Sequence, residues 1–224
     1  MEKKRILFYL IRHGETDWNL SKRMQGRDDI PLNRSGRLQA EQIAEALAAV
    51  PFSLIVTSPL SRAADTAKAV GSRHPGVPIV EDPLLVERDK GNVSGLTPAE
   101  REAFLASGGT ENQEPVTSVR TRAREALAHC MELIDAARPS YEPDNSTVHV
   151  AVVTHGGLIY HLLNSISEDI LNTPSGRRTL RNASVCILTD ADEVLAVDLT
   201  ADEFGGYWDG QRSHDRIISE RPIA

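Results

Sequence analysis

Residues 5–14 read RILFYLIRHG, a continuous apolar run over Ile6–Ile11 that stops at Arg12 and His13. A short apolar run rich in β-branched and aromatic residues is typical of a strand buried on both faces of a parallel sheet. The charged residues that follow it stand at the carboxyl end of that strand. Ligands of open α/β sheets bind at this edge. The stretch therefore predicts a buried central strand that carries Arg12 and His13 to a ligand site.

The rest of the chain alternates between strand-like and helix-like patterns. Apolar runs predict strands at 53–57, 77–80 and 148–153, and a closing hairpin at 185–188 and 194–199. Apolar residues at helical spacing predict helices at 33–50, 59–70, 97–106, 118–137 and 158–166. Such alternation is typical of a sheet covered on both faces. We expect an α/β fold, a three-layer α/β/α sandwich with a mainly parallel central sheet and an antiparallel edge strand.

Length and composition favour a single domain over residues 1–224, with 200–224 as a polar surface tail. The formal net charge of −7 argues against nucleic acid or an anionic membrane as a partner. Cys130 and Cys186 lie on apolar faces and are expected to be buried, reduced thiols, which favours a cytoplasmic protein. A homodimer could form through the exposed edge of the terminal hairpin.

Cationic side chains are predicted to follow three strands directly. Arg12 and His13 follow the first, Arg62 follows the second, and His155 with Gly156 follows the strand at 148–153. Helix N-termini at the same edge add backbone N–H groups and a favourable dipole for an anion. This placement predicts a pocket for a phosphoryl group. Zinc binding by His13 and His155 is the alternative, but neighbouring arginines would repel a cation, so no metal or other cofactor is expected.

Five sequence blocks, in order along the chain, resemble the motifs of the histidine phosphatase superfamily, whose fold is that of phosphoglycerate mutase. The first is LIRHGE with Thr16, Trp18 and Asn19 behind it. The others are LNRSG at 32–36, TSPLSRA at 57–63, LVERDKGNVSG at 85–95 and THGG at 154–157. One such tripeptide alone would be weak evidence, but five ordered blocks are specific.

The resemblance implies a role for each matching residue in a metal-independent phosphomonoesterase. His13 would be the nucleophile that becomes phosphorylated, and Glu87 would protonate the leaving oxygen. The residues expected to bind the phosphoryl oxygens are Arg12, Asn19, Arg62, His155 and Gly156. Preorganised donors of this kind stabilise charge on a phosphoryl group without a metal. The expected partner is a small phosphorylated metabolite.

The substrate side of the site departs from the family pattern. Residues 87–95 read ERDKGNVSG, where the family commonly has a Gly-x-Trp-Glu-Gly run, so Arg88 and Lys90 could recognise a second anionic group or simply be solvated. Gln25 and Gly26 are expected in the loop beside the phosphate.

Other activities of the same fold also remain open. Phosphoglycerate mutases carry an Arg-Arg pair and a Tyr after this segment, whereas Arg101 is the only basic residue between Gly95 and Val119. This favours a phosphatase over the alternatives, a mutase or sugar bisphosphatase of the same family. A non-catalytic phosphate-binding module is less favoured, because both His13 and Glu87 are present.

Overall fold

A six-stranded sheet forms the centre of the computed structural model, which describes residues 5–136, 147–168, 170–173, 176–177 and 179–208. The strand order is β3-β2-β4-β1-β7-β8, and β1, β2, β3 and β4 run parallel to one another. β7 is antiparallel to β1 and to β8, so the antiparallel strand lies one position in from the edge. The strands are β1 Ile6–Arg12, β2 Phe52–Thr57, β3 Ile79–Glu81, β4 Val148–Thr154, β7 Val185–Thr189 and β8 Val194–Leu199.

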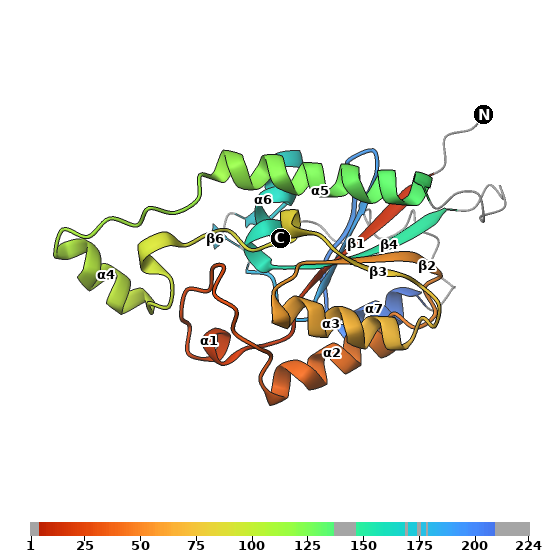
Figure 1. Cartoon of the computed structure of the whole chain (residues 1–224), viewed down its shortest axis with the longest axis horizontal. Coiled ribbons are helices and arrows are strands. Elements are labelled where there is room, and N and C mark those ends of the chain that lie inside the picture. The colour runs from red at the N-terminus through yellow and green to blue at the C-terminus, as the bar shows by residue number, and fades with distance from the viewer. Residues whose placement is uncertain (1–4, 137–146, 169, 174–175, 178, 209–224) are drawn as a thin grey trace.

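Helices cover both faces of this sheet, as Figure 1 shows, which confirms the predicted three-layer fold. One face carries α2 (Arg34–Ala46), α3 (Ser61–Ser72) and α7 (Ala201–Trp208), and the other carries α5 (Val116–Ala136) and α6 (Gly156–Ile166). Shorter elements stand in the connections: α1 Asp17–Leu20, the 3₁₀ turns η1 Pro83–Leu85 and η2 Gly91–Val93, α4 Pro98–Ala106, and the small hairpin of β5 Asn172–Thr173 and β6 Gly176–Arg177. Among the described segments, none of the helices has the length and hydropathy that a membrane span requires.

β1 is buried on both faces, as its apolar run predicted. Leu7, Tyr9 and Ile11 join the core beneath α2, α3 and α7. Phe8 and Leu10 point the other way and join the core beneath α5 and α6. Successive strand residues point to opposite faces, so a strand between two helical layers needs apolar residues at every position.

Local capping sets where several helices begin. Asn33 accepts a hydrogen bond from the Gly36 N–H at 2.8 Å, so α2 starts directly after it. Thr97 and Glu100 form a capping box at the start of α4. The prediction that α3 begins at Pro59 is wrong, because this helix starts at Ser61. The N-cap residue is Leu60 rather than Ser58, and Ser58 Oγ accepts from the Leu60 N–H at 3.3 Å and lies 2.8 Å from His155 Nε2.

The predicted surface tail over 200–224 needs correction in its first part. Residues 201–208 form α7, and Phe204 on this helix is fully buried against the core under α2 and α3. Two adjacent glycines and two acidic residues among residues 201–208 made the pattern too weak to predict the helix. Residues 209–224 lie outside the described residues.

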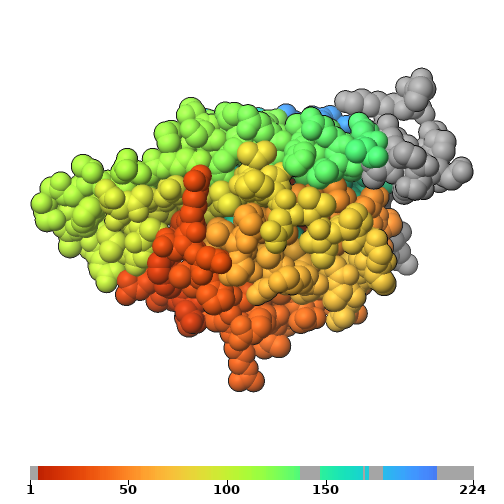
Figure 2. All heavy atoms as spheres, in the orientation of Figure 1, coloured from red at the N-terminus to blue at the C-terminus, as the bar shows by residue number. Residues whose placement is uncertain are grey.

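The carboxyl ends of three neighbouring strands meet at one edge of the sheet. The His13 N–H donates to Thr154 O at 3.0 Å, and the Ser58 N–H donates to Val153 O at 3.0 Å. The segments that follow β1, β2 and β4 therefore leave the sheet at the same level. Beyond this edge lie α1, α4 and their connecting loops, which form the end of the molecule to the left in Figures 1 and 2. The parallel register therefore brings together the segments that the sequence analysis selected.

Candidate active site

His13 stands directly after β1 and is almost completely buried. Its Nδ1 lies 2.7 Å from the carbonyl oxygen of Gly14. A carbonyl only accepts, so Nδ1 carries the hydrogen and Nε2 keeps its lone pair in the neutral ring. Burial lowers the pKa of His13 well below its usual range, and the charges of Arg12 and Arg62 lower it further. The ring is therefore neutral at physiological pH, with its unprotonated nitrogen free to act as a nucleophile.

Arg12 and Arg62 bring two guanidinium groups to this imidazole. Arg12 donates through Nη1 to Leu180 O. Arg62 is completely buried and donates to Asp28 O at 2.8 Å and to Gly26 O at 2.9 Å. Burial lowers the pKa of Arg62 to about 10, which leaves it charged at neutral pH. Both side chains are thus fixed by backbone carbonyls, which do not cancel their charge.

His155 follows β4 and is the N-cap residue of α6. Its ring centroid lies 5.1 Å from that of His13. Burial lowers the pKa of His155 well below its usual range, with further lowering by Arg62 and the other nearby cations. When Nε2 of the neutral ring accepts from the Ser58 hydroxyl, the ring hydrogen is on Nδ1. Nδ1 is then a donor available to an anion.

Glu87 lies between η1 and η2, and its carboxylate is held by two backbone N–H groups. Gly157 donates to Oε2 at 2.9 Å and Arg88 donates to Oε1 at 2.7 Å. Gly157 is in the first turn of α6, so Glu87 sits over the N-terminus of the helix that His155 caps. The charge of Glu87 also acts on both Arg12 and Arg62. The acid therefore borders the same space as the two histidines.

Asn19 reaches the site through a small network of amides and hydroxyls. Its Oδ1 accepts from the Thr16 N–H at 3.1 Å and from Asn182 Nδ2 at 3.2 Å. Gln25 donates through Nε2 to Thr16 Oγ1 at 3.0 Å, so it joins the same network. Asn182 Nδ2 also lies 3.1 Å from His13 O and thereby ties this loop to β1. These contacts connect Asn19 to the backbone of His13 through Asn182, and Gln25 to the same network through Thr16.

Three buried nitrogen atoms of the site have no hydrogen-bond partner among the described residues. They are Arg12 Nε, Arg62 Nε and His155 Nδ1. A buried donor without a partner costs free energy, on the order of 1–3 kcal/mol each. A group with several acceptor oxygens at this position would satisfy all three. The arrangement suits an anion and repels a metal cation. In the described part of the chain, no cluster of three or more His, Cys, Asp or Glu side chains could hold a metal.

The remaining predicted site residues are Gly26, Gly156, Arg88 and Lys90. Gly26 accepts from Arg62, and a Cβ on Gly156 would lie 3.1 Å from Arg12 Nε, so both border the phosphoryl side. Arg88 donates through Nε to Glu114 O at 2.9 Å, so part of its guanidinium serves the loop. Lys90 packs against Gly26 with its aliphatic stem. A role of Arg88 and Lys90 in binding a second anionic group stays a prediction.

Sequence reasoning did not assign functional roles to Ser58, Asn182, Glu114 or Arg122. Ser58 lies in the matched block at 57–63 but received no role of its own, although it bonds to His155. Asn182 lies in a loop whose path cannot be inferred from hydrophobic periodicity. Glu114 and Arg122 look like ordinary surface charges at the start of an amphipathic helix. Only the folded contacts place these four residues around the site.

A cavity of about 720 Å³ opens beside Arg12 and Asn19. Its walls come from α2, the 179–183 segment and the start of α7. Half of the wall residues are neutral and polar, namely Asn19, Gln39, Gln42, Thr179, Asn182 and Thr200, and Arg12, Arg181 and Asp202 add charge. Its volume is within the range of small-molecule sites.

An α/β sheet whose carboxyl edge gathers two guanidinium groups, two imidazoles and a carboxylate defines a phosphoryl-transfer enzyme. The family model of the histidine phosphatase superfamily (branch 1) matches residues 8–203, and the chain belongs to this superfamily. The family and enzyme class expected from the five sequence blocks, a phosphoglycerate mutase-like phosphomonoesterase, are confirmed.

Three relatives illustrate the range of this superfamily. The chain is 37% identical over 158 residues to an uncharacterized phosphatase, PhoE, of Bacillus subtilis strain 168, covering 70% of this chain and 76% of that protein. It is 32% identical over 191 residues to a probable phosphoglycerate mutase, GpmB, of Enterobacter sp. strain 638, covering 79% and 81%. The native structure of a mycobacterial glucosyl-3-phosphoglycerate phosphatase is similar with a TM-score of 0.71 and 30% identity, covering 88% of this chain and 100% of that one.

Proposed function

We propose that this protein hydrolyses a small phosphomonoester through a phosphohistidine formed at His13. One observation carries the proposal: a neutral, buried imidazole whose Nδ1 is held by Gly14 O faces a set of buried cationic and imidazole donors. A histidine held in this tautomer is a competent nucleophile. The unpartnered nitrogens of Arg12, Arg62 and His155 would meet the phosphoryl oxygens.

The reaction takes place in two steps. In the first, His13 Nε2 attacks phosphorus, the bond from phosphorus to the ester oxygen breaks, and protonated Glu87 gives its proton to the leaving alcohol. In the second, the Glu87 carboxylate takes a proton from water, the hydroxide attacks phosphorus, and the N–P bond breaks to restore neutral His13. Phosphate and alcohol leave. General acid–base assistance of this kind contributes roughly 10²–10⁴-fold in rate.

The cationic groups on the substrate side support a phosphatase rather than a mutase. Arg101 forms an ion pair with Glu111, and Arg23 forms one with Glu100 at 2.9 Å. A mutase must hold a carboxylate-bearing acceptor, and these paired arginines do not offer free charge for that purpose. The relatives named as probable phosphoglycerate mutases keep a mutase as the second candidate.

The proposed substrate class is a small phosphorylated metabolite. The cavity beside Arg12 and Asn19 has a volume within the range of small-molecule sites, and polar and charged side chains line much of it. The structurally similar mycobacterial phosphatase, whose name gives glucosyl-3-phosphoglycerate as its substrate, supports this class. Because Cys130 and Cys186 are both buried thiols, we propose that the protein acts in the reducing cytoplasm.

The test is a screen of phosphomonoesters in the presence of a chelator, followed by alkaline quenching and mass spectrometry of the peptide that contains His13. We expect phosphate release without metal and a phosphoryl group on His13, because an N–P bond survives alkali. His13→Asn should lose both signals. His74→Asn is the matched control, since His74 is a buried histidine at the end of α3 that contacts Phe52 and lies outside the site.

Retention of metal-free turnover in His13→Asn would overturn the proposal. Transfer of the phosphoryl group to an added phosphoglycerate in preference to water would favour the mutase. Binding of phosphomonoesters without any turnover would favour a non-catalytic module.

A further inference from the structure

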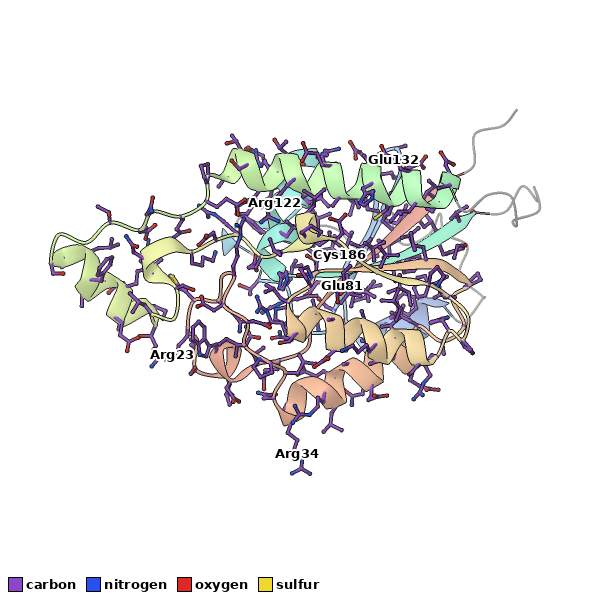
Figure 3. All side chains as sticks on the ribbon, in the orientation of Figure 1. Arg23, Arg34, Glu81, Arg122, Glu132 and Cys186 are labelled. Carbon is purple, nitrogen blue, oxygen red and sulfur yellow. The ribbon has the colours of Figure 1, made fainter. Side chains whose placement is uncertain are left out.

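Arg122 joins the first half of α5 to the segment in front of Glu87. Its side chain is only 11% exposed. Nη1 donates to Leu84 O at 2.8 Å and to Val86 O at 2.5 Å. In Figure 3 Arg122 lies on the side of α5 that faces this segment, whereas Glu132 lies on the outer side of the same helix. One guanidinium therefore holds the two carbonyls that flank Leu85, immediately before the acid.

Glu114 holds both Arg122 and the residues that follow Glu87. Its carboxylate makes two parallel bonds with Arg122, at 2.9 Å to Nε and 3.1 Å to Nη2. The same carboxylate accepts from the Asp89 N–H at 3.1 Å. Burial alone would raise the pKa of Glu114, but the bonds from Arg122 and Asp89 lower it overall, so the carboxylate stays ionised. A bidentate pair of this kind has a single preferred geometry.

The Arg122–Glu114 ion pair thus fixes the backbone both before and after Glu87. The residues before it are bonded to Arg122, and Asp89 after it is bonded to Glu114 on both sides, since the Glu114 N–H also donates to Asp89 O at 3.1 Å. The carboxylate of Glu87 itself accepts from the backbone N–H groups of Gly157 and Arg88. No hydrogen bond joins Arg122 to Glu87 among the described residues. Arg122 therefore acts on the position of the acid through the backbone, while its charge also reaches the site and contributes to the lowered pKa of His155.

We infer that Arg122, held by Glu114, is a positioning residue that places the Glu87 carboxyl for proton transfer to the leaving oxygen. The inference rests on the proposed phosphatase function, and it adds a residue on α5 to the residues that the reaction needs. Its consequence is selective. A displaced acid slows the departure of a poor leaving group, such as an alkoxide, and has little effect on an acidic phenol that leaves without a proton.

The test compares two substrates in Arg122→Met, a variant that keeps the length of the side chain and removes the fork. The kcat/KM values for an alkyl phosphate and for a nitrophenyl phosphate report only steps up to leaving-group departure, so they isolate the proton transfer from hydrolysis of the phosphohistidine. We expect the alkyl phosphate value to fall by about 10²-fold, the cost typical of a small displacement of a reacting group. The nitrophenyl value should stay within a few-fold of wild type.

Two further variants calibrate this result. Glu87→Gln should show the same selectivity with a larger loss. Glu114→Gln breaks the ion pair from the other side and should reproduce the pattern of Arg122→Met, which keeps the inference testable if one of the two fails to fold. Arg124→Met is the matched control. Arg124 lies one half-turn further along α5 and pairs with Asp192 at 2.6 Å, and its loss should leave both substrates unaffected.

Equal losses on both substrates in Arg122→Met would overturn the inference, because they indicate general damage to the fold or the phosphoryl side. Unchanged values for both substrates would overturn it as well. If wild-type protein has no His13-dependent turnover of either ester, the proposed function itself falls and the inference falls with it. These outcomes are distinguished by the wild-type and His13→Asn measurements in the same assay.

Discussion

The two sides of the active site are built from different kinds of structure. On the phosphoryl side, His13 and His155 follow adjacent parallel strands, and Arg62 lies in the first turn of the helix after a third. On the leaving-group side, Glu87 lies in an irregular segment between two 3₁₀ turns. The first side is fixed by the register of the sheet. The second depends on side chains, above all the pair Arg122 and Glu114, to hold its backbone in place.

This difference suggests how the site divides its tasks. The phosphoryl group is common to every phosphomonoester, so the groups that bind it can be fixed in the most rigid part of the fold. Leaving groups vary, and a loop can change its sequence without disturbing the sheet. Residues 87–95, which include Arg88 and Lys90, depart from the family pattern, and they lie on the leaving-group side. The Arg122–Glu114 pair then keeps Glu87 in the same position while the sequence of the surrounding loop varies.

The strongest challenge to this comparison is removal of Arg62. We expect Arg62→Met to lower kcat/KM by about 10²–10³-fold for alkyl and nitrophenyl phosphates alike, the cost typical of losing one oxyanion donor. Arg62→Lys should recover little, because an ammonium cannot keep the bonds to Gly26 O and Asp28 O in the same plane. Steady-state kinetics on both esters provide the measurement. Arg73→Met, at the other end of α3, is an exposed control that should stay near wild type.

Selectivity between the two esters in Arg62→Met would contradict the division, because it would mean that a phosphoryl ligand also governs leaving-group departure. Circular dichroism of the variant would show whether the fold is retained, since Arg62 is a buried residue with two structural hydrogen bonds.

Two neighbouring glycines allow a finer test of the same division. A Cβ on Gly157 would lie 2.4 Å from Glu87 Oε1, whereas a Cβ on Gly156 would lie 3.1 Å from Arg12 Nε. Gly157→Ala must displace the acid, so we expect a loss of about 10- to 100-fold on the alkyl phosphate and little change on the nitrophenyl phosphate. Gly156→Ala should produce a smaller loss that is equal for both.

Gly205→Ala controls for the general effect of alanine in a helix, because nothing lies within 4 Å of the added Cβ. A loss in Gly157→Ala that is the same for both esters would show that the two sides are not separable at the start of α6.

How far the sequence predicts this site follows from the same contrast. The phosphoryl side could be predicted because strand ends of a parallel sheet converge whatever the details of packing, and Arg12, His13, Arg62 and His155 all follow apolar runs. Glu87 was found only by its spacing in a family motif, since several acidic residues crowd that segment. Arg122 was not found, because a single buried arginine on an amphipathic helix has the sequence pattern of a solvated one. The helix α7, which buries Phe204, was missed because its short, glycine-containing sequence has a weak helical pattern.

The smallest expected effect is on the free energy of unfolding. The two sides of the active site should contribute to it over different pH ranges. The pKa values of His13 and His155 are lowered by burial from 6.5, so below about pH 6.5 the unfolded chain binds protons that the folded chain does not. The contribution of these two histidines to the free energy of unfolding is therefore fully present above this pH. It falls as the pH drops, by at most about 1.4 kcal/mol per pH unit for each histidine. On the leaving-group side, the lowered pKa of Glu114 gives a contribution that is lost only below its usual value of 4.5.

Urea unfolding of wild type and His155→Gln between pH 7.5 and 5.0 measures the histidine contribution, and the variant should lose less stability over this range. His74 has a pKa lowered by burial as well, so its contribution appears in both proteins and cancels in the difference. Glu114→Gln should keep the wild-type slope in this window, because the carboxylate that it removes titrates at lower pH. A flatter slope in Glu114→Gln than in His155→Gln would reverse the assignment. It would mean that the charges of the loop, rather than the buried imidazoles at the sheet edge, make the fold sensitive to mild acid.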